Sequence, residues 1–475
     1  MAKFSIENFG CRATDADASA LRRGLVSQGF TPVREHAGAD VVVLNTCTVT
    51  AAADSQARRA VRRIHRLNPT ARIVLTGCYA QRAPEELAEL PGVTLVIGNS
   101  HQSEVPDLLG KMSSQDAFPQ SRSGGFFPLA HLEDGSMSLA RGPAKILTAD
   151  IFARTPAMEM QSALGGPVEG DRTRPILKIQ DGCNNRCSYC VIPFVRGRSR
   201  SLPPDSVVEE VRSLAAAGAR EVVLSGINLG AYGRDLSPRA DLTLVALRIL
   251  NETELEQLRL SSIEPQDVTE DFISLASSSD RIAPHFHIPL QSGSDAILRA
   301  MHRWYRAAHY AERVKLIRRT LPNSAIGADV IVGFPGETDE DFQATAELIE
   351  RLPFAYLHVF SFSERPGTEA ERLDQRVSHA VIRERARKLR SVSLAKSAAF
   401  RSSQSERPMR ALTLAHRGEA SNEVWTEALT GNYLKVRIAG RLSANGWYEV
   451  RVAQDASVVH PARPLAPFYA EVNHS

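Results

Sequence analysis

Half of the cysteines in this chain lie within eight consecutive residues. The stretch "DGCNNRCSYCVIP" holds Cys183, Cys187 and Cys190, and the 475 residues contain only six cysteines in all. A structural zinc site closes with four ligands, usually two Cys-x2-Cys pairs, and this stretch has no partner pair nearby. Three soft thiolates therefore favour an iron–sulfur cluster, with a catalytic zinc ion as the alternative. Three ligands on a four-iron cluster leave one iron open to a substrate or cofactor.

The composition is that of an ordinary folded protein. Hydrophobic residues make up 43% and charged residues 23% of the sequence, and the net charge is only +3. At roughly 150 residues per domain, the length predicts about three domains. The first ten residues lack the features of a signal peptide, and no run approaches the ~20 apolar residues of a membrane span. We therefore expect a cytoplasmic protein, whose clustered thiols stay reduced and serve as metal ligands.

Beyond residue 175, strand-like and helical patterns alternate. The strand-like runs are "PILKIQ", "EVVLSG", "LRLSSI", "HFHIPL", "AIGADVIVG" and "YLHVFSF". One of the helical patterns between them predicts a continuous helix over residues 295–319. This alternation favours a parallel sheet with crossover helices, so we predict a partial six-unit (β/α) barrel over residues 171–404. Chemistry in such folds takes place at the carboxyl ends of the strands, where Cys183 follows "PILKIQ".

The other three cysteines each end a strand-like run. Cys11 ends "KFSIENFGC", Cys47 ends "DVVVLNTC" and Cys78 ends "RIVLTGC", with helical patterns between them. We therefore predict a small parallel α/β domain over residues 1–105, whose strand ends share one edge of the sheet. At that edge the three cysteines would converge as a second three-thiolate cluster site. The alternative is that they are three buried small apolar residues, a common role of free cysteine.

The first cysteine group resembles the signature of the radical S-adenosylmethionine (SAM) family. The resemblance rests on Cys-x3-Cys-x2-Cys after a strand, with Tyr189 and Pro193 nearby, and chance spacing in a loop is the alternative. In that family the open iron binds SAM, and an electron from the cluster cleaves SAM to a 5′-deoxyadenosyl radical. Within such a pocket we predict SAM or substrate contacts from Tyr189, Gly226, Glu264 and Gln291.

Both cysteine groups together resemble the methylthiotransferases of that family. The segments that carry the resemblance are "NTCTVTAAAD", "LTGCYAQ", "LKIQDGCNNRCSYCVIP", "RGRSRS", "HIPLQSGSD", "DVIVGFPGET" and "FSERPGT", and they extend over nearly the whole chain. Members insert sulfur and a methyl group at an unactivated C–H bond. This C–H group is too weakly acidic for any general base of this chain to remove its proton. A cofactor must therefore carry out the difficult chemistry.

The resemblance also implies a set of cofactors and partners. Two [4Fe-4S] clusters and SAM are the expected cofactors, with a flavodoxin-like or ferredoxin-like electron donor and a sulfur donor that the sequence does not identify. The expected ligands of the SAM cluster are Cys183, Cys187 and Cys190, and those of the auxiliary cluster are Cys11, Cys47 and Cys78.

The last part of the chain favours tRNA as the substrate. Residues 405–460 contain short strand-like runs separated by Gly, Asn and Ser, which predict a small β-barrel. In position it resembles the TRAM domain, a barrel that grips tRNA in relatives. Lys435, Arg437 and Arg441 are candidate phosphate contacts there, although each alone is equally a solvated surface charge.

Two basic segments agree with an RNA partner. In a helix that begins near Asp54, the basic residues share one face or flank it, and they are Arg58, Arg59, Arg62, Arg63 and Arg66. The second segment, residues 299–319, is rich in Arg and interleaves Trp304 and Tyr305, as a nucleic-acid surface would. The alternative for each segment alone is a solvated helix face.

Four segments resemble one branch of the methylthiotransferases in particular. They are "NTCTVT", "LTGCYAQ", "GINLGAYGRD" and "RLSSIEP", and the branch acts on N6-threonylcarbamoyladenosine at position 37 of tRNA. The branch that acts on isopentenyladenosine at the same position is the alternative, and a third branch modifies an aspartate of a ribosomal protein. A radical SAM enzyme with a simpler outcome such as methylation, and a non-catalytic iron–sulfur protein that binds RNA or senses redox state, are the more distant alternatives.

Two segments lack clear periodicity. Residues 106–170 are rich in Ser, Gly and Pro and predict a mobile linker or insertion. Residues 461–475 predict an extended tail, since three prolines fall within it.

Overall fold

The structure of the protein is a computed structural model. It describes residues 1–114, 137–139, 144–153, 172–405, 407–420, 423–452, 458–459 and 463–464. The chain forms two compact units. The first is made of Met1–Asp171, Gln180–Leu202 and Ser363–Glu371, and the second of Arg172–Ile179, Pro203–Phe362 and Arg372–Ser475. Among the helices in the described ranges, none has the length and apolar character that crossing a bilayer requires.

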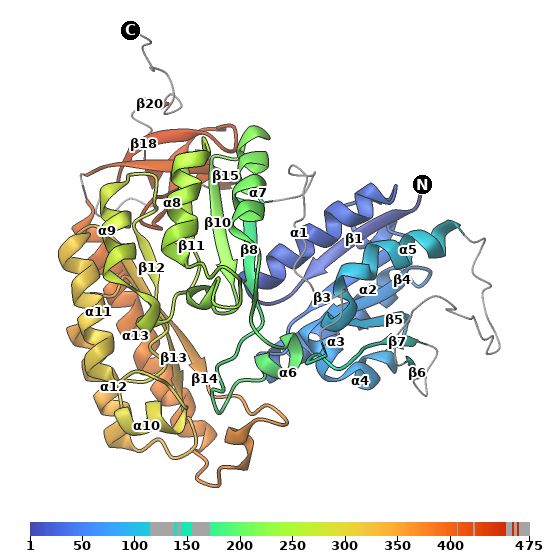
Figure 1. Ribbon diagram of the computed structural model, residues 1–475, viewed down its shortest axis with the longest axis horizontal. Helices are drawn as coiled ribbons and strands as arrows, with labels where there is room; N and C mark the ends of the chain where they lie inside the picture. Colours follow the sequence, from blue (N-terminus) through green and yellow to red (C-terminus); the bar gives the residue numbers. More distant parts are fainter. Residues whose placement is uncertain are drawn as a thin grey trace. The chain divides into compact units, whose positions relative to one another are not determined.

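A seven-stranded sheet lies at the centre of the first unit, with the order β2-β1-β3-β4-β5-β7-β6 (Figure 1). Its strands are β1 (Lys3–Asn8), β2 (Thr31–Pro32), β3 (Val41–Thr46), β4 (Arg72–Gly77), β5 (Val93–Gly98), β6 (Met137–Leu139) and β7 (Lys145–Leu147). All pairings are parallel except that of β6 with β7. Strand β3 is buried along its whole length, as a parallel strand covered on both faces should be.

Helices cover both faces of this sheet. They are α1 (Arg12–Ser27), α2 (Ala51–Leu67), α3 (Cys78–Arg82), α4 (Pro84–Ala88) and α5 (Val105–Ser114). Alternate residues of β3 enter two separate cores, because successive side chains of a strand point to opposite faces. Val42 packs in one core with Ile64 of α2, and Val43 packs in the other with Leu25 of α1. The predicted parallel α/β fold of this part is confirmed.

The predicted linker contains regular structure where it is described. Helix α5 covers its first residues, and β7 pairs parallel with β5 as a further strand of the first sheet. Ile146 and Leu147 of β7 are both buried. The first sheet thus extends beyond residue 105, and two apolar residues between polar ones are too short a pattern to reveal such a strand. The predicted mobility of the remainder falls on residues outside those described.

Six strands of the second unit alternate with helices and form a partial barrel. The strands are β8 (Ile176–Asp181), β10 (Glu221–Gly226), β11 (Gln257–Leu260), β12 (His285–His287), β13 (Ala325–Val332) and β14 (Tyr356–Ser361). They form two parallel sets, β11-β10-β8 and β12-β13-β14. Bridges from Leu258 to Ile282 and from Ser262 to His287 link the two sets. Strand β8 continues into the first unit, where its end pairs with β9 (Arg200–Ser201).

The helices of this unit follow the strands in the predicted order. They are α7 (Pro204–Ala216), α8 (Leu242–Glu252), α9 (Glu270–Ser278), α10 (Asp295–Ala300), α11 (Ala307–Thr320), α12 (Asp339–Arg351) and α13 (His379–Ser403). Side chains cap many of their first turns; at α12, Thr338 and Asp341 form a reciprocal capping box. The single helix predicted over residues 295–319 was wrong, since it is divided into α10 and α11. His302 between them has a left-handed φ of 57°, which ends the first helix.

The C-terminal strands form a curled, mainly antiparallel sheet with the order β19-β17-β16-β15-β18-β20. They are β15 (Pro408–Ala420), β16 (Glu423–Thr430), β17 (Lys435–Ala439), β18 (Trp447–Arg451), β19 (Val458–Val459) and β20 (Arg463–Pro464). Its core includes Ala411, Ala428 and Ile438. The guanidinium of Arg259 in β11 donates to the carbonyl oxygen of Gly431 at 2.8 Å, which ties this sheet to the barrel strands of the same unit. Most of the predicted tail lies outside the described residues.

Candidate functional site

All six cysteines are free thiols and belong to the first unit. Each of the N-terminal three follows a parallel strand, as the sequence predicted: Cys11 follows β1, Cys47 follows β3 and Cys78 follows β4. Since these strands are neighbours in the sheet, their carboxyl ends place the three cysteines at one edge.

Two glycines let the chain approach closely at this edge. Gly10, before Cys11, has a φ of +115°, and a Cβ added there would lie 2.6 Å from the Cβ of Cys47. Gly77, before Cys78, has a φ of +96°, and its added Cβ would lie 2.4 Å from the carbonyl oxygen of Thr46. Any other residue would push the cysteine-bearing segments apart, because these φ values and contacts suit only glycine.

The thiols of this group influence one another electrostatically. Burial raises the pKa of Cys47 to about 12, and repulsion from Cys78 and Cys11 adds to this effect. Burial likewise raises the pKa of Cys78, although Arg196 opposes the increase. Both thiols are therefore protonated at neutral pH until a positively charged group binds, and binding of a metal or cluster releases those protons.

The spacing of the cysteines suits a cluster better than one metal ion. Three thiolates on a single zinc ion lie about 3.8 Å apart, since each Zn–S bond is about 2.3 Å long. Among the described residues, the one group of three possible ligands with donor atoms within 4.8 Å of one another contains no cysteine. Three soft sulfur donors at wider spacing fit an iron–sulfur cluster.

The second cysteine group lies on a loop that begins where β8 ends. The amide of Cys183 donates to the carbonyl oxygen of Gly197 at 3.1 Å, and that of Cys190 to the carbonyl oxygen of Cys187 at 3.0 Å. All three cysteines of the group are partly exposed. Tyr189, a predicted SAM contact, lies between the last two of them. The loop is thus folded by its backbone and keeps its thiols accessible.

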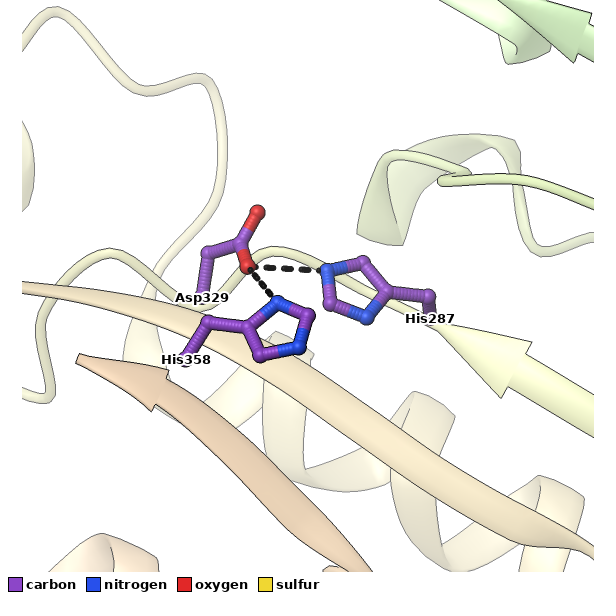
Figure 2. A group of neighbouring side chains, drawn as sticks. All are labelled: His287, Asp329 and His358. Carbon is purple, nitrogen blue, oxygen red and sulfur yellow. Dashed lines mark hydrogen bonds and ion pairs between the residues drawn. The ribbon is translucent and has the colours of Figure 1, made fainter. Parts of the chain in front are cut away.

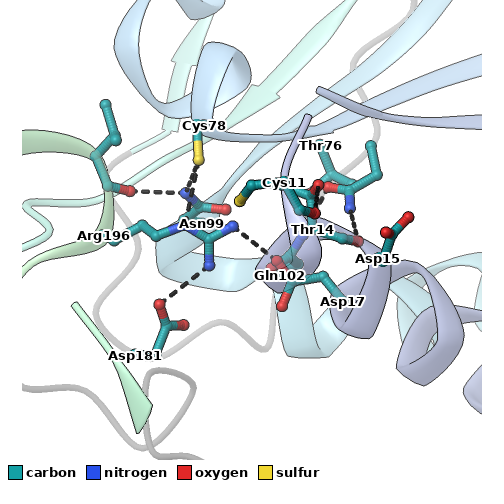
Figure 3. Close-up of polar contacts among 12 residues, drawn as sticks. Cys11, Thr14, Asp15, Asp17, Thr76, Cys78, Asn99, Gln102, Asp181 and Arg196 are labelled. Atoms are coloured by element: carbon teal, nitrogen blue, oxygen red, sulfur yellow. Dashed lines mark hydrogen bonds and ion pairs between the residues drawn. The ribbon is translucent and has the colours of Figure 1, made fainter. Parts of the chain in front are cut away.

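One buried arginine links the sulfur of Cys78 to Asp181, which precedes the second cysteine group (Figure 3). Arg196, at the end of α6 (Ile192–Arg196), donates from Nε to the Cys78 sulfur at 3.2 Å, and its side chain is only 1% exposed. It also pairs with Asp17 at 2.8 Å and with Asp181 at 3.0 Å. Burial would lower the pKa of Arg196, but Cys78, Asp17 and Asp181 together raise it well above its ordinary value. Asp181 ends β8, two residues before Cys183, so Arg196 links Cys78 to the start of the loop that holds the second group.

The Cys78 sulfur accepts from a second donor. The side-chain amide of Asn99 lies 3.5 Å from the sulfur and 2.7 Å from the carbonyl oxygen of Val195, to which it also donates. Because hydrogen bonds to sulfur tune an iron–sulfur cluster, both Arg196 and Asn99 could set the electronic properties of a group bound through Cys78.

A second network fixes the segment that follows β14. Arg365 pairs with Asp54 at 2.7 Å and donates to the carbonyl oxygen of Thr48 at 3.0 Å, next to Cys47. The amide of Ala370 donates to the carbonyl oxygen of Ser188, within the second cysteine group. Residues 363–371 therefore contact the neighbourhood of both groups within the first unit.

The other predicted SAM contacts lie in the second unit. Gly226 ends β10, Glu264 follows β11, and Gln291 follows β12 with a φ of 64°. Each comes at or after the carboxyl end of a strand, the edge of a parallel barrel where ligands bind. Glu264 pairs with Arg303; burial raises the pKa of this carboxyl group, although Arg303 opposes the increase. Their contact with SAM stays a prediction.

The basic segment over residues 299–319 was predicted wrongly in part. Arg303 forms an ion pair with Glu264 inside the unit. Tyr305 is buried, and its hydroxyl group donates hydrogen bonds to the carbonyl oxygens of Pro289 and Leu290. Trp304 is 79% exposed. The side chains that remain on the surface with it are Arg299, Arg306, Lys315 and Arg319. In α2, Arg58 pairs with Glu86, whereas most of the other arginines are exposed.

Sequence reasoning missed two arginines of these networks, one that contacts Cys78 and one that contacts Thr48 beside Cys47. Arg196 and Arg365 both occur in segments that carried the resemblance, "RGRSRS" and "FSERPGT". The motifs were a signal that these arginines matter, but their partners lie far away in the sequence.

Known proteins match the chain along most of its length. The Radical SAM superfamily matches residues 177–349, and uncharacterized protein family UPF0004 matches residues 3–98. The threonylcarbamoyladenosine tRNA methylthiotransferase MtaB of Aquifex aeolicus is 36% identical over 438 residues, which cover 92% of this chain and 97% of the relative. The chain belongs to the radical SAM methylthiotransferase family.

Other relatives of this methylthiotransferase carry two different names. MtaB of Bacillus subtilis is 34% identical, with 93% of this chain and 91% of the relative covered. A tRNA-2-methylthio-N(6)-dimethylallyladenosine synthase of Syntrophobacter fumaroxidans is also 34% identical, with 82% and 79% covered.

A solved structure supports the fold. The radical SAM methyltransferase TsrM of Kitasatospora setae aligns with a TM-score of 0.51 at 17% identity, covering 78% of this chain and 74% of that one. That structure contains cobalamin and a [4Fe-4S] cluster. At this identity, the likeness concerns the fold alone.

Proposed function

We propose that this protein is a tRNA methylthiotransferase that adds a methylthio group to C2 of N6-threonylcarbamoyladenosine at position 37 of tRNA. The observation that carries the proposal is that one unit contains both three-cysteine groups. The chain that contains them is 36% identical to an MtaB protein, 97% of whose length is covered. A redox sensor or a simple methyltransferase of this superfamily has no evident use for the second group.

Each cysteine group holds one [4Fe-4S] cluster in this proposal. The SAM cluster takes Cys183, Cys187 and Cys190, and the auxiliary cluster takes Cys11, Cys47 and Cys78. When bound, the clusters and SAM supply the electron, the radical chemistry, the sulfur and the methyl group, none of which a side chain can provide.

The contribution of the chain is to bind, orient and exclude water. The ends of β1, β3 and β4 position the auxiliary ligands, of which Cys47 and Cys78 are buried and Cys11 is exposed. The positive charge of Arg196 lies against the Cys78 sulfur and offsets the negative charge of its thiolate. SAM would bind at the partly exposed Cys183 loop, with Tyr189 beside it. Gly226, Glu264 and Gln291 are proposed to line the SAM or substrate pocket.

The tRNA would contact exposed basic surfaces of each unit. In the first unit these are the exposed arginines of α2, which are Arg59, Arg62, Arg63 and Arg66. In the second unit it is the patch around Trp304, whose exposed ring can stack on a base. In the C-terminal sheet, Arg437 lies over the ring of Trp425 at 4.4 Å, and Lys435 pairs with Glu427. A flavodoxin-like or ferredoxin-like protein would supply electrons, and we place the enzyme in the cytoplasm with its substrate.

Mass spectrometry of tRNA nucleosides from cells with and without the gene tests this function. We expect 2-methylthio-N6-threonylcarbamoyladenosine to disappear from the deleted strain and its precursor without the methylthio group to accumulate. If the methylthio derivative of isopentenyladenosine disappeared instead, the reaction would be as proposed but the substrate would be isopentenyladenosine. This substrate is the second candidate, because some relatives are named dimethylallyladenosine synthases. If no tRNA nucleoside changed, tRNA modification would be excluded.

A further inference from the structure

Three possible metal ligands meet on one face of the sheet β12-β13-β14 in the second unit. His287 ends β12, Asp329 lies in the middle of β13, and His358 lies in β14 directly opposite Asp329 in the strand register. Helix α13 lies along the free edge of β14, where the hydroxyl of Ser393 hydrogen-bonds with the amide and the carbonyl oxygen of Leu357. Since successive side chains of a strand point to opposite faces, Asp329 and His358 share one face of the sheet.

The donor atoms of this group converge on one carboxylate oxygen (Figure 2). Oδ1 of Asp329 lies 3.0 Å from Nε2 of His287 and 3.1 Å from Nδ1 of His358. Ligand atoms that share one transition-metal ion lie about 2.9–3.5 Å apart, for bond lengths of about 2.0–2.2 Å. The two distances to Asp329 fall within this range, and all three donor atoms lie within 4.8 Å of one another.

One of the histidines already has the outer support that metal ligands need. A histidine that binds a metal through one ring nitrogen normally donates a hydrogen bond from the other. Nδ1 of His287 lies 3.1 Å from the hydroxyl of Tyr356, which is itself held by Nε2 of His285 at 2.8 Å. Gly327 makes this possible, because a Cβ there would lie 2.1 Å from the tyrosine ring.

The charge balance of the group also favours a cation. In the part of the chain that the structure describes, the ion pairs of Asp329 are with the two histidines, and no Arg or Lys joins them. The side chain of His287 is 7% exposed and that of His358 is 56% exposed, so the group is anchored on one side and open on the other.

We propose that His287, Asp329 and His358 bind a divalent transition-metal ion of the zinc type, separate from the iron–sulfur clusters. Two imidazoles and a carboxylate are the ligands that such ions prefer. Three protein ligands leave at least one position for water or for an oxygen donor of a bound molecule. The site is thus an open Lewis-acid site, and it does not depend on the function proposed above.

The test uses protein with both clusters fully loaded, so that iron occupies the cysteines. The protein is incubated with Zn²⁺ and dialysed against metal-free buffer, and the retained zinc is measured by elemental analysis and X-ray absorption. We expect one zinc per chain with nitrogen and oxygen ligands at about 2.0–2.1 Å. His358→Ala and Asp329→Asn should retain none, whereas His379→Ala, which changes an exposed histidine elsewhere, should retain zinc like the unchanged protein.

Three outcomes would overturn the site. Zinc retained equally by His358→Ala, or zinc with sulfur ligands, would place the ion elsewhere. No retained zinc would mean that the three side chains form only a hydrogen-bonded His–Asp–His group. Since His358 is largely exposed, its replacement opens no core cavity, and thermal melting verifies the fold. Tyr356→Phe keeps all three ligands but removes the outer hydrogen bond, so its zinc affinity should fall about 10–100-fold. Unchanged affinity in that variant would contradict the supporting role of Tyr356.

Discussion

At the scale of single residues, the buried guanidinium group of Arg196 forms ion pairs with two buried carboxylates near the cysteines. Arg196→Met would remove the buried cation that pairs with the carboxylates of both Asp17 and Asp181. We expect a loss of about 3–5 kcal/mol in the free energy of unfolding, measured by urea titration of the cluster-loaded protein. Arg200→Met is the matched control, because Arg200 pairs with the same Asp181 from a more exposed position and should cost only about 0–1 kcal/mol. Equal losses in both variants would show that burial of Arg196 is unimportant.

The raised pKa of Cys47 makes the stability of the iron-free protein depend on pH. The folded protein keeps this thiol protonated up to a pH of about 12, whereas an unfolded chain loses the proton near about pH 8.5. Between these pH values the unfolded state binds fewer protons than the folded state. The contribution of the Cys47 thiol to stability is therefore complete below about pH 8.5 and is lost as the pH rises. The loss is up to about 1.4 kcal/mol per pH unit for this one group.

Urea unfolding of the reduced, iron-free protein between pH 7 and pH 10 measures this dependence. Cys47→Ala should unfold with a flatter pH profile than the unchanged protein. Identical profiles would mean that the thiol titrates normally in the folded state.

Spacing alone identified the cysteines but not their partners. Three thiols in one short loop, and three more at strand ends, are patterns that a sequence displays directly. Arg196 and Cys78 are 118 residues apart, and only the folded sheet brings them together. The same holds for His287, Asp329 and His358, whose three strands each contribute one side chain to a common face.

At the scale of elements, the strands were predictable because their apolar runs are dense and end at polar or glycine residues. The break between α10 and α11 was not predictable, because the sequence over 295–319 keeps a helical pattern. A tertiary contact sets the start of α11: Oδ1 of Asp295 accepts a hydrogen bond from the amide of Ala307, in the first turn of that helix. A contact between two helices leaves no periodic signal in either one.

This contact gives a prediction for the helix pair. Asp295→Ala removes the acceptor and should lower the free energy of unfolding by about 1 kcal/mol, as the loss of a helix cap does. Thermal or urea unfolding measures it, with Glu312→Ala at an exposed position of α11 as the control. An unchanged midpoint for Asp295→Ala would show that the start of α11 does not depend on this hydrogen bond.

At the scale of the whole molecule, the division into units differs from the division predicted along the sequence. Gln180–Leu202 and Ser363–Glu371 fold with the N-terminal sheet rather than with the barrel residues that flank them. The sequence could not reveal this, because both segments belong by position to the barrel repeat. As a consequence, one unit contains all six cysteines.

Arg365 fixes the second of these segments to the first unit. Arg365→Ala removes its ion pair with Asp54, and hydrogen bonds to charged groups contribute about 1.5–3 kcal/mol. We therefore expect a protease specific for Glu to cleave within residues 363–371 about tenfold faster or more. Arg372→Ala, just beyond the segment and exposed, is the control that should leave the rate unchanged. Equal cleavage rates in both variants would mean that other contacts hold the segment.

The division of labour between the two cysteine groups is the central claim, and one comparison in vitro tests it most directly. The reconstituted protein, Cys47→Ala and Cys187→Ala are each incubated with SAM, reductant and tRNA, and 5′-deoxyadenosine and methylthio nucleoside are measured in the same samples. We predict that Cys47→Ala loses roughly half of the iron, still forms 5′-deoxyadenosine and makes no methylthio product, whereas Cys187→Ala forms neither product. Methylthio product from Cys47→Ala, or 5′-deoxyadenosine from Cys187→Ala, would contradict the account.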